Sequence, residues 1–155
     1  MSFTLLSKVP YEEGVVLKTK RDLKHLSRAG SCVAETLERV ASGVKPGVST
    51  AYLEEVCRKH LFEHYSDSTI EKVEDFPAYL SVSVNEVAVH GVPGPSLLRG
   101  GDLVTIDLAI KVDGWYGDAA VTLPVGTVSP EVMHLIKAAE AATDAGIASV
   151  SAGGR

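Results

Sequence analysis

Residues 100–126 read GGDLVTIDLAIKVDGWYGDAAVTLPVG, and the rest of the chain must pack against whatever this stretch forms. Two alternating apolar runs flank Asp113-Gly114, the dipeptide that most strongly indicates a two-residue hairpin turn. We therefore expect an antiparallel hairpin in which Val112 lies opposite Trp115.

The two faces of this hairpin differ in character, because successive side chains of a strand point to opposite sides. The register sets Ala109 opposite Asp118 and Asp107 opposite Ala120. The two aspartates are then diagonal neighbours on one face, roughly 7–8 Å apart at the backbone. The other face is apolar and is the expected core, with Val104, Ile106, Leu108, Ile110 and Val112.

Like charges at this separation repel, and the hairpin alone leaves two interpretations open. Water can screen the repulsion, in which case the face is simply solvated, as is common for antiparallel sheets with one wet side. Alternatively, a cation neutralises both carboxylates, and Asp107 and Asp118 form half of a metal site.

Composition limits the class of protein. A chain of 155 residues with 45% hydrophobic and 23% charged residues is long enough for a single globular domain with a sizeable core. The net charge of −5 gives no electrostatic footprint for nucleic acid or an anionic membrane, so we expect neither as a partner. No apolar run approaches membrane-spanning length and no signal-peptide pattern is present, so we expect a cytoplasmic protein.

Three helices are expected around the strands. The first begins at Thr19, where Thr-Lys-Arg-Asp resembles a capping box. The second opens at Ser49 or Thr50, and the third opens at Pro130. Residues 1–17 show no clear period and are expected to form an N-terminal arm. Weak matches between the first and third helices, at an offset of 107 residues, suggest a second copy of a two-helix, two-hairpin unit.

The segment between the second helix and the central hairpin carries a further candidate residue. Residues 66–75 are polar and are expected to form a loop, whereas residues 79–84 and 87–89 are expected to form a short hairpin. That hairpin leads directly into His90-Gly91-Val92-Pro93-Gly94-Pro95, a loop in which backbone can approach a ligand closely. The position of His90 beside the carboxylate-bearing hairpin makes it a functional candidate.

Spaced motifs along residues 17–126 resemble one family, the type I methionine aminopeptidases of the pita-bread fold. The motifs are Leu17-Lys18-Thr19, Arg28-Ala29-Gly30, VKPGVST at 44–50, SVNE at 83–86, HGVP at 90–93, Gly101-Asp102, Ile106-Asp107, Asp113-Gly114 and Gly117-Asp118. The resemblance implies an α+β fold in which residues 1–155 form a single domain. That domain holds one α-α-β-hairpin repeat and the first helix of the second repeat.

The resemblance also implies roles for individual residues. Asp107 and Asp118 match the two aspartates that bind a pair of divalent cations, which could be cobalt, manganese, iron or zinc. His90 matches the histidine that hydrogen-bonds the substrate near the scissile amide, and Phe76 matches an aromatic of the substrate pocket. In the family, a hydroxide held between the two metals attacks the first peptide bond of a nascent protein, which is the logic of two-metal hydrolysis.

This sequence departs from the family pattern at several positions. Ala119 and Ala109 stand where family members usually have threonines, and Tyr116 stands where many have histidine. The expected pocket lining is thin beyond Phe76. The preference of the pocket for methionine therefore does not follow from the motifs alone.

The family draws its other metal ligands, one histidine and two glutamates, from a second half that these 155 residues do not match. We therefore expect an N-terminal portion of a metallopeptidase that is inactive by itself and works with the missing half. Three alternatives stay open: a non-catalytic pita-bread binding module, a prolidase-like aminopeptidase, and self-association of two copies that mimics the whole domain.

Overall fold

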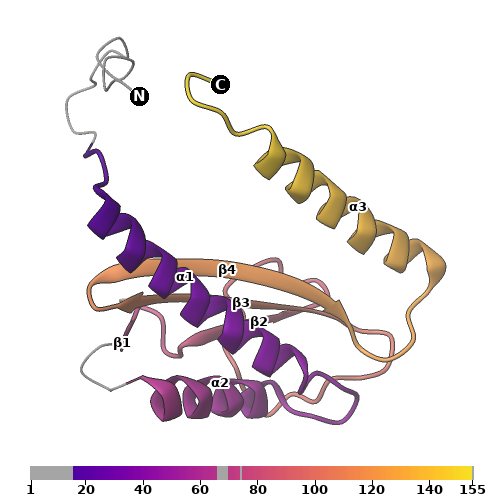
Figure 1. Ribbon diagram of the computed structural model, residues 1–155. Coiled ribbons are helices and arrows are strands. Elements are labelled where there is room, and N and C mark those ends of the chain that lie inside the picture. Colours follow the sequence, from indigo (N-terminus) through magenta and orange to yellow (C-terminus); the bar gives the residue numbers. More distant parts are fainter. Residues whose placement is uncertain (1–15, 66–69, 74, 155) are drawn as a thin grey trace.

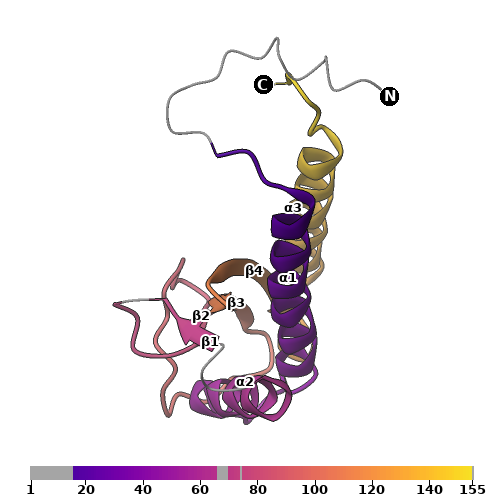
Figure 2. The same ribbon diagram turned by 60° about the vertical axis from the view of Figure 1, so that its left-hand side comes forward.

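The computed structural model describes residues 16–65, 70–73 and 75–154, and it has a helical layer on one side of a sheet (Figures 1 and 2). The predicted N-terminal arm, residues 1–17, lies outside the described residues except for Val16 and Leu17, which are exposed. The elements in chain order are α1 (Lys20–Ala41), α2 (Thr50–His64), β1 (Ile70–Lys72), β2 (Leu80–Val84), β3 (Leu103–Val112), β4 (Trp115–Pro124) and α3 (Pro130–Ala148).

Strand β3 is the centre of the sheet, and all its pairings are antiparallel. β4 pairs with β3 along its whole length, while β1 and β2 pair with different parts of its other edge. Val112 lies opposite Trp115, Ala109 opposite Asp118 and Asp107 opposite Ala120, so the predicted register is confirmed.

The turn between β3 and β4 explains why this register is so well specified. Asp113 and Gly114 have φ angles of 51° and 79°, and two central residues with positive φ are the mark of a type I′ turn. This turn has the twist that antiparallel strands need. The Arg28 guanidinium of α1 also donates a 2.7 Å hydrogen bond to the Asp113 carboxylate, which ties the first helix to the turn.

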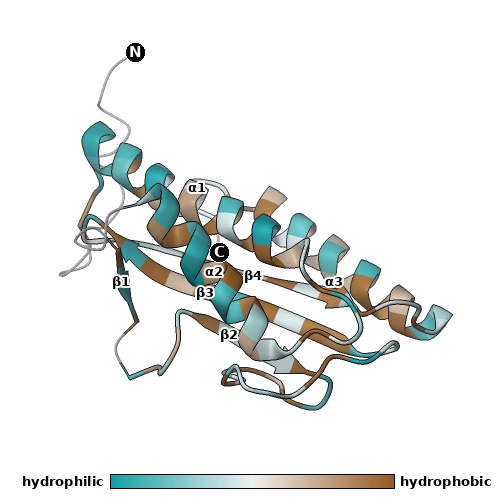
Figure 3. Ribbon diagram, turned by 90° about the horizontal axis from the view of Figure 1, so that it is seen from below, coloured by the Kyte–Doolittle hydropathy of each residue, from teal (hydrophilic) through white to brown (hydrophobic). Residues whose placement is uncertain are grey.

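The core lies between the sheet and the helices α1 and α2. The alternate residues of β3 predicted for the core, from Val104 to Val112, are all buried. Helix α1 begins with the predicted capping box, since Thr19 and Asp22 bond each other's backbone N–H groups. In Figure 3 the long strands β3 and β4 are mainly apolar, whereas α1 alternates polar and apolar residues along its turns. Cys32 and Cys57 are buried free thiols.

Two local predictions are wrong. Residues 70–72, expected in a loop, form the short strand β1, because Ile70 is buried against the end of β3. Residues 87–89, expected to form a strand, do not form one. Asn85 instead joins the end of β2 to the start of β3: its amide donates to Asp102 at 2.9 Å and accepts the Leu103 N–H at 2.9 Å.

Helix α3 packs much less closely than the other two helices. It begins with Ser129 as N-cap and Pro130 in its first turn, as predicted. Ile136 is its only buried residue, while Leu135 and Ile147 are more than 60% exposed. A groove of about 610 Å³ separates it from β4. No helix in the described part of the chain is long and apolar enough to cross a membrane.

The contact between α1 and β4 gives a test of this packing. A Cβ added at Gly117 would lie 2.5 Å from the Ala29 carbonyl oxygen, so Gly117→Ala must push α1 away from the sheet. We expect it to lower the free energy of unfolding by about 1–3 kcal/mol. Gly30→Ala is the matched control, because Gly30 lies in the exposed interior of α1 with open space around it. That change should raise stability by about 0.5–1 kcal/mol. Urea unfolding of both variants would measure the two effects, and equal effects would contradict this packing.

Candidate metal centre

The candidate centre starts from two carboxylates on the sheet face opposite the helices. Asp107 lies on β3 opposite Ala120 and Asp118 lies on β4 opposite Ala109, so the two aspartates are two residue pairs apart in the register and on the same face. Asp107 is partly buried, whereas Asp118 is exposed. The structure therefore brings together the two residues that the hairpin pattern predicted. The backbone pairing of β3 with β4 places them there, independently of any interaction between the two side chains.

The electrostatics of this pair favour a cation. Burial raises the pKa of Asp107, the Asp118 carboxylate raises it further, and His90 partly offsets the increase. Within the described residues, neither aspartate takes part in an ion pair. Two carboxylates without an ion-pair partner among the described residues therefore share one face, and a divalent ion would offset both the desolvation of Asp107 and the repulsion between the two groups.

His90 reaches this face from a tightly held loop. Its φ is 58°, a left-handed conformation that is uncommon for a residue other than glycine. The next residue, Gly91, accepts the Val82 N–H at 2.8 Å, and a Cβ there would lie 2.1 Å from the Val82 carbonyl oxygen. Only glycine lets the loop come this close to β2, so Gly91 fixes where His90 sits.

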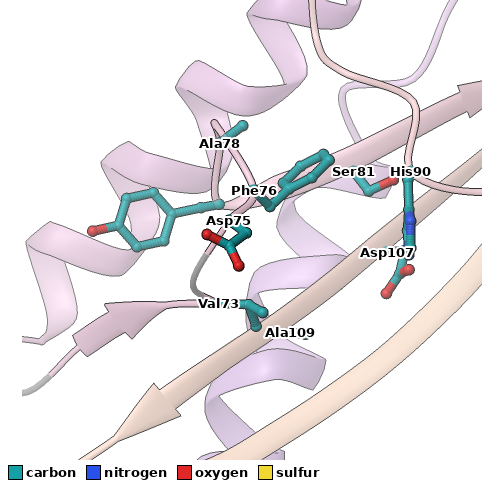
Figure 4. Close-up of a pocket in the computed structure, with 9 residues that line it drawn as sticks. Val73, Asp75, Phe76, Ala78, Ser81, His90, Asp107 and Ala109 are labelled. Atoms are coloured by element: carbon teal, nitrogen blue, oxygen red, sulfur yellow. The ribbon is translucent and has the colours of Figure 1, made fainter.

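A cavity of about 300 Å³ opens beside Asp107. Figure 4 shows Ser81, His90 and Asp107 gathered at one end of it, with Val73, Phe76 and Ala78 around the rest. Phe76, expected in the substrate pocket, lies 6.3 Å from the His90 ring between centroids. The full lining is Val73, Asp75, Phe76, Ala78, Tyr79, Ser81, His90, Asp107 and Ala109; Asp118 is not part of it.

Helix α2 holds the start of β2 and the loop that follows His90 in place. The Glu54 carboxylate accepts the backbone N–H groups of Tyr79 at 3.0 Å and Leu80 at 2.8 Å. On the other side, Thr50 exchanges two hydrogen bonds with the backbone of Gly94, at 3.0 and 2.9 Å. Sequence reasoning missed Glu54, because the two N–H groups that it binds lie 25 and 26 residues further along the chain.

The described residues fit part of a divalent-metal site. Carboxylate oxygens are the ligands that hard divalent ions prefer, and the pKa of Asp107 is raised first by burial and then by the Asp118 carboxylate. No group of three or more histidine, cysteine, aspartate or glutamate side chains able to hold a metal occurs among the residues that the structure describes. Asp107 and Asp118 are therefore an incomplete ligand set.

Comparison with known proteins identifies relatives of this chain. Residues 24–155 match the model of metallopeptidase family M24. The chain is 32% identical over 139 residues to a methionine aminopeptidase of Helicobacter pylori strain J99, covering 90% of this chain and 55% of that protein. It is 33% identical over 141 residues to methionine aminopeptidase 1 of Bacillus subtilis, covering 91% and 57%. The chain thus spans about half the length of the curated relatives it matches.

Solved structures agree on the fold. The crystal structure of methionine aminopeptidase from Rickettsia prowazekii superposes with a TM-score of 0.73 at 32% identity, covering 79% of this chain and 50% of that one. Escherichia coli aminopeptidase P, at 24% identity, superposes with a TM-score of 0.61 over 73% of this chain and 25% of that one. The predicted pita-bread fold is confirmed, as a partial domain of mixed helix and sheet.

We expect divalent-metal binding to require Asp107 and Asp118 together. Asp107→Asn or Asp118→Asn leaves a single carboxylate, which cannot chelate, so each should reduce affinity for manganese or cobalt at least tenfold, and the double variant should abolish binding. Titration calorimetry would measure this. Glu38→Gln is the control, because Glu38 is an exposed carboxylate on α1. Unchanged heats in the double variant would mean that water alone screens this face.

Proposed function

The chain belongs to metallopeptidase family M24, as its motifs predicted, and from this premise we propose that it contributes Asp107, Asp118 and His90 to the active site of a methionine aminopeptidase. The observation that carries the proposal is the pair of carboxylates in fixed register on one face, without a described cationic partner and beside a cavity. The methionine aminopeptidases of Helicobacter pylori and Bacillus subtilis that the chain resembles supply the activity. The substrates would be nascent proteins in the cytoplasm, each presenting an N-terminal methionine.

Each residue has a role that its position supports. Asp107 and Asp118 would hold two divalent ions between them, drawn from manganese, cobalt, iron and zinc. Ions bound there would acidify a water molecule and neutralise charge on the carbonyl oxygen of the first peptide bond. His90, fixed by Gly91 at the rim of the cavity, would donate a hydrogen bond to the substrate amide. Phe76 would contact the first side chain.

The other ligands of the proposed centre would come from sequence outside these 155 residues. In the described part of the chain, β4 pairs with β3 only, so its outer edge has free backbone groups. The groove between β4 and α3 is lined partly by apolar residues, including Val121, Leu135 and Ile136. We propose that this edge and groove receive the missing half of the domain. A second copy of the chain could occupy them in its absence.

The 155-residue chain alone should release no methionine from a Met-Ala-Ser peptide. A two-metal hydrolase needs enough anionic and imidazole ligands to hold both ions, and this chain supplies two carboxylates. Fusion to the C-terminal half of the Bacillus subtilis relative should restore metal-dependent release. The control fusion carries Asp107→Asn and Asp118→Asn. Chelator-sensitive cleavage by the purified chain alone would contradict the proposal, as would a well-folded fusion that binds metal and stays inactive.

In the active fusion, removal of the His90 side chain should lower the chemical rate by roughly a hundredfold or more, the usual scale for a positioned proton-handling group. His90→Asn is the suitable change, because asparagine tolerates the positive φ at this position better than alanine does. Since His90 is exposed, the melting temperature should hardly change. Single-turnover kinetics and thermal unfolding would separate the two effects. A variant that unfolds with no change in rate per folded molecule would make His90 a structural residue.

A further inference from the structure

Helix α2 ends in a pair of histidines that the proposed function does not use. Residues 60–64 read His-Leu-Phe-Glu-His, and this H-x-x-E-H pattern places two imidazoles four residues apart on one face of the helix. Histidines at this spacing bind zinc in more than one class of helical metal site. A pattern this short carries weight only through the geometry of the pair.

The two imidazole rings lie against each other in the structure. Their centroids are 4.4 Å apart and their planes are tilted by 31°. A zinc ion bonds imidazole nitrogens at about 2.0–2.1 Å, so one ion can bridge two nitrogens that are up to about 4 Å apart. The rings are therefore close enough for one nitrogen of each to bind the same ion.

The His64 ring is held as a metal ligand requires. Its Nδ1 lies 2.9 Å from the His60 carbonyl oxygen, and a carbonyl oxygen only accepts, so Nδ1 carries the proton and donates it. In the neutral ring, Nε2 then keeps a free lone pair. A hydrogen bond from one ring nitrogen to a backbone carbonyl is a common way in which a metal-binding histidine is oriented.

His60 contributes a buried nitrogen that lacks a partner. Its Nε2 is shielded from water and has no hydrogen-bond partner within the part of the chain that the structure describes. A polar atom in this state destabilises the free protein, because it has lost its water without gaining a bond. A metal ion that enters beside the exposed His64 would supply the missing partner.

The charges around His60 suit a bound cation. Burial lowers the pKa of His60 and the neighbouring His64 ring lowers it further, so the ring is uncharged at neutral pH and keeps a lone pair. The other charged groups that act on it are two carboxylates, Glu35 of α1 and Glu63 of α2, and one guanidinium, Arg39 of α1. The pair also lies in the last turns of α2, where the negative end of the helix dipole stabilises positive charge.

We propose that His60 and His64 bind one transition-metal ion of the zinc, nickel or copper class, at a site separate from Asp107 and Asp118. Helix α2 packs on the core side of the sheet, whereas the two aspartates lie on the opposite face (Figures 1 and 2). Imidazole nitrogens suit these ions, while carboxylate oxygens suit manganese and magnesium. No third histidine, cysteine, aspartate or glutamate completes the set within the described residues, so water fills the other coordination positions.

Zinc alone is the probe for this site. The full chain would carry Asp107→Asn and Asp118→Asn, so that the carboxylate centre cannot contribute, and NMR would follow its ¹⁵N-labelled imidazoles during the titration. We expect the signals of His60 and His64 to shift together along one binding curve, with His64 coordinated through Nε2. Manganese should leave both rings unbound, because it prefers oxygen ligands.

Loss of either ring should weaken zinc binding at least tenfold, because a single imidazole cannot chelate. His64→Ala is the main variant, since His64 is exposed and its removal should not disturb the fold. His60→Gln should have the same effect on binding. The matched control is His134→Ala, which removes an exposed histidine of α3 and should leave the affinity within twofold.

Three results would overturn the proposal. The first is a titration in which one ring shifts without the other, or in which neither ring shifts. The second is zinc binding that survives unchanged in His64→Ala. The third is equal weakening by His134→Ala, which would mean that zinc binds surface histidines without preference.

Thermal unfolding gives an independent measurement, because an ion that binds only the folded chain raises the unfolding midpoint. Zinc at about a hundred times its dissociation constant should raise the midpoint of the double aspartate variant by a few degrees. The same chain with His64→Ala should show no increase. An equal increase in both chains, or none in either, would overturn the proposal.

Discussion

The type I′ turn at Asp113-Gly114 is the constraint on which the rest of this structure depends. Its two positive φ angles fix the pairing of β3 with β4 residue by residue. A slip of one residue would move every side chain to the opposite face, exposing the core and burying the aspartates. The hydrogen bond from Arg28 to Asp113 adds a tertiary contact to this local preference. The same turn therefore specifies both the core and the candidate metal centre.

The two faces of the sheet have opposite effects on stability. The helix side is packed so closely that Gly117 has no room for a methyl group against Ala29. The other side keeps two carboxylates near each other and a buried serine hydroxyl that has no hydrogen-bond partner among the described residues, and both features lower the stability of the free chain. Proteins tolerate destabilising groups of this kind where a bound ligand later neutralises them. The stability that compensates for them in the free chain comes from the packed face.

Local signals in the sequence predicted the parts of the fold that local chemistry controls. The turn dipeptide, the alternation along residues 103–112 and the capping box at Thr19 gave the register, the core face and the start of α1. The position of Asp107 and Asp118 on one face of the hairpin followed from the same register. Strand β1 and the path of residues 87–89 could not be predicted this way, because they depend on contacts distant in sequence, such as that of Asn85 with Leu103. Glu54 and Ser81 were missed for the same reason. A serine on a short alternating strand has no special signature until its cross-strand neighbour is known.

The architecture couples the candidate metal centre to the cavity through shared backbone. Asp107 is one strand away from Ser81, and both depend on β2 being held in register with β3. The first turns of α2 fix that strand from outside the sheet, since Glu54 binds the N–H groups at its start and Thr50 binds the loop that follows His90. Asp107 and the wall of the cavity formed by β2 thus belong to one hydrogen-bonded unit. A shift of α2 would move β2 relative to the rest of the sheet, and would therefore change the cavity and the surroundings of Asp107 together.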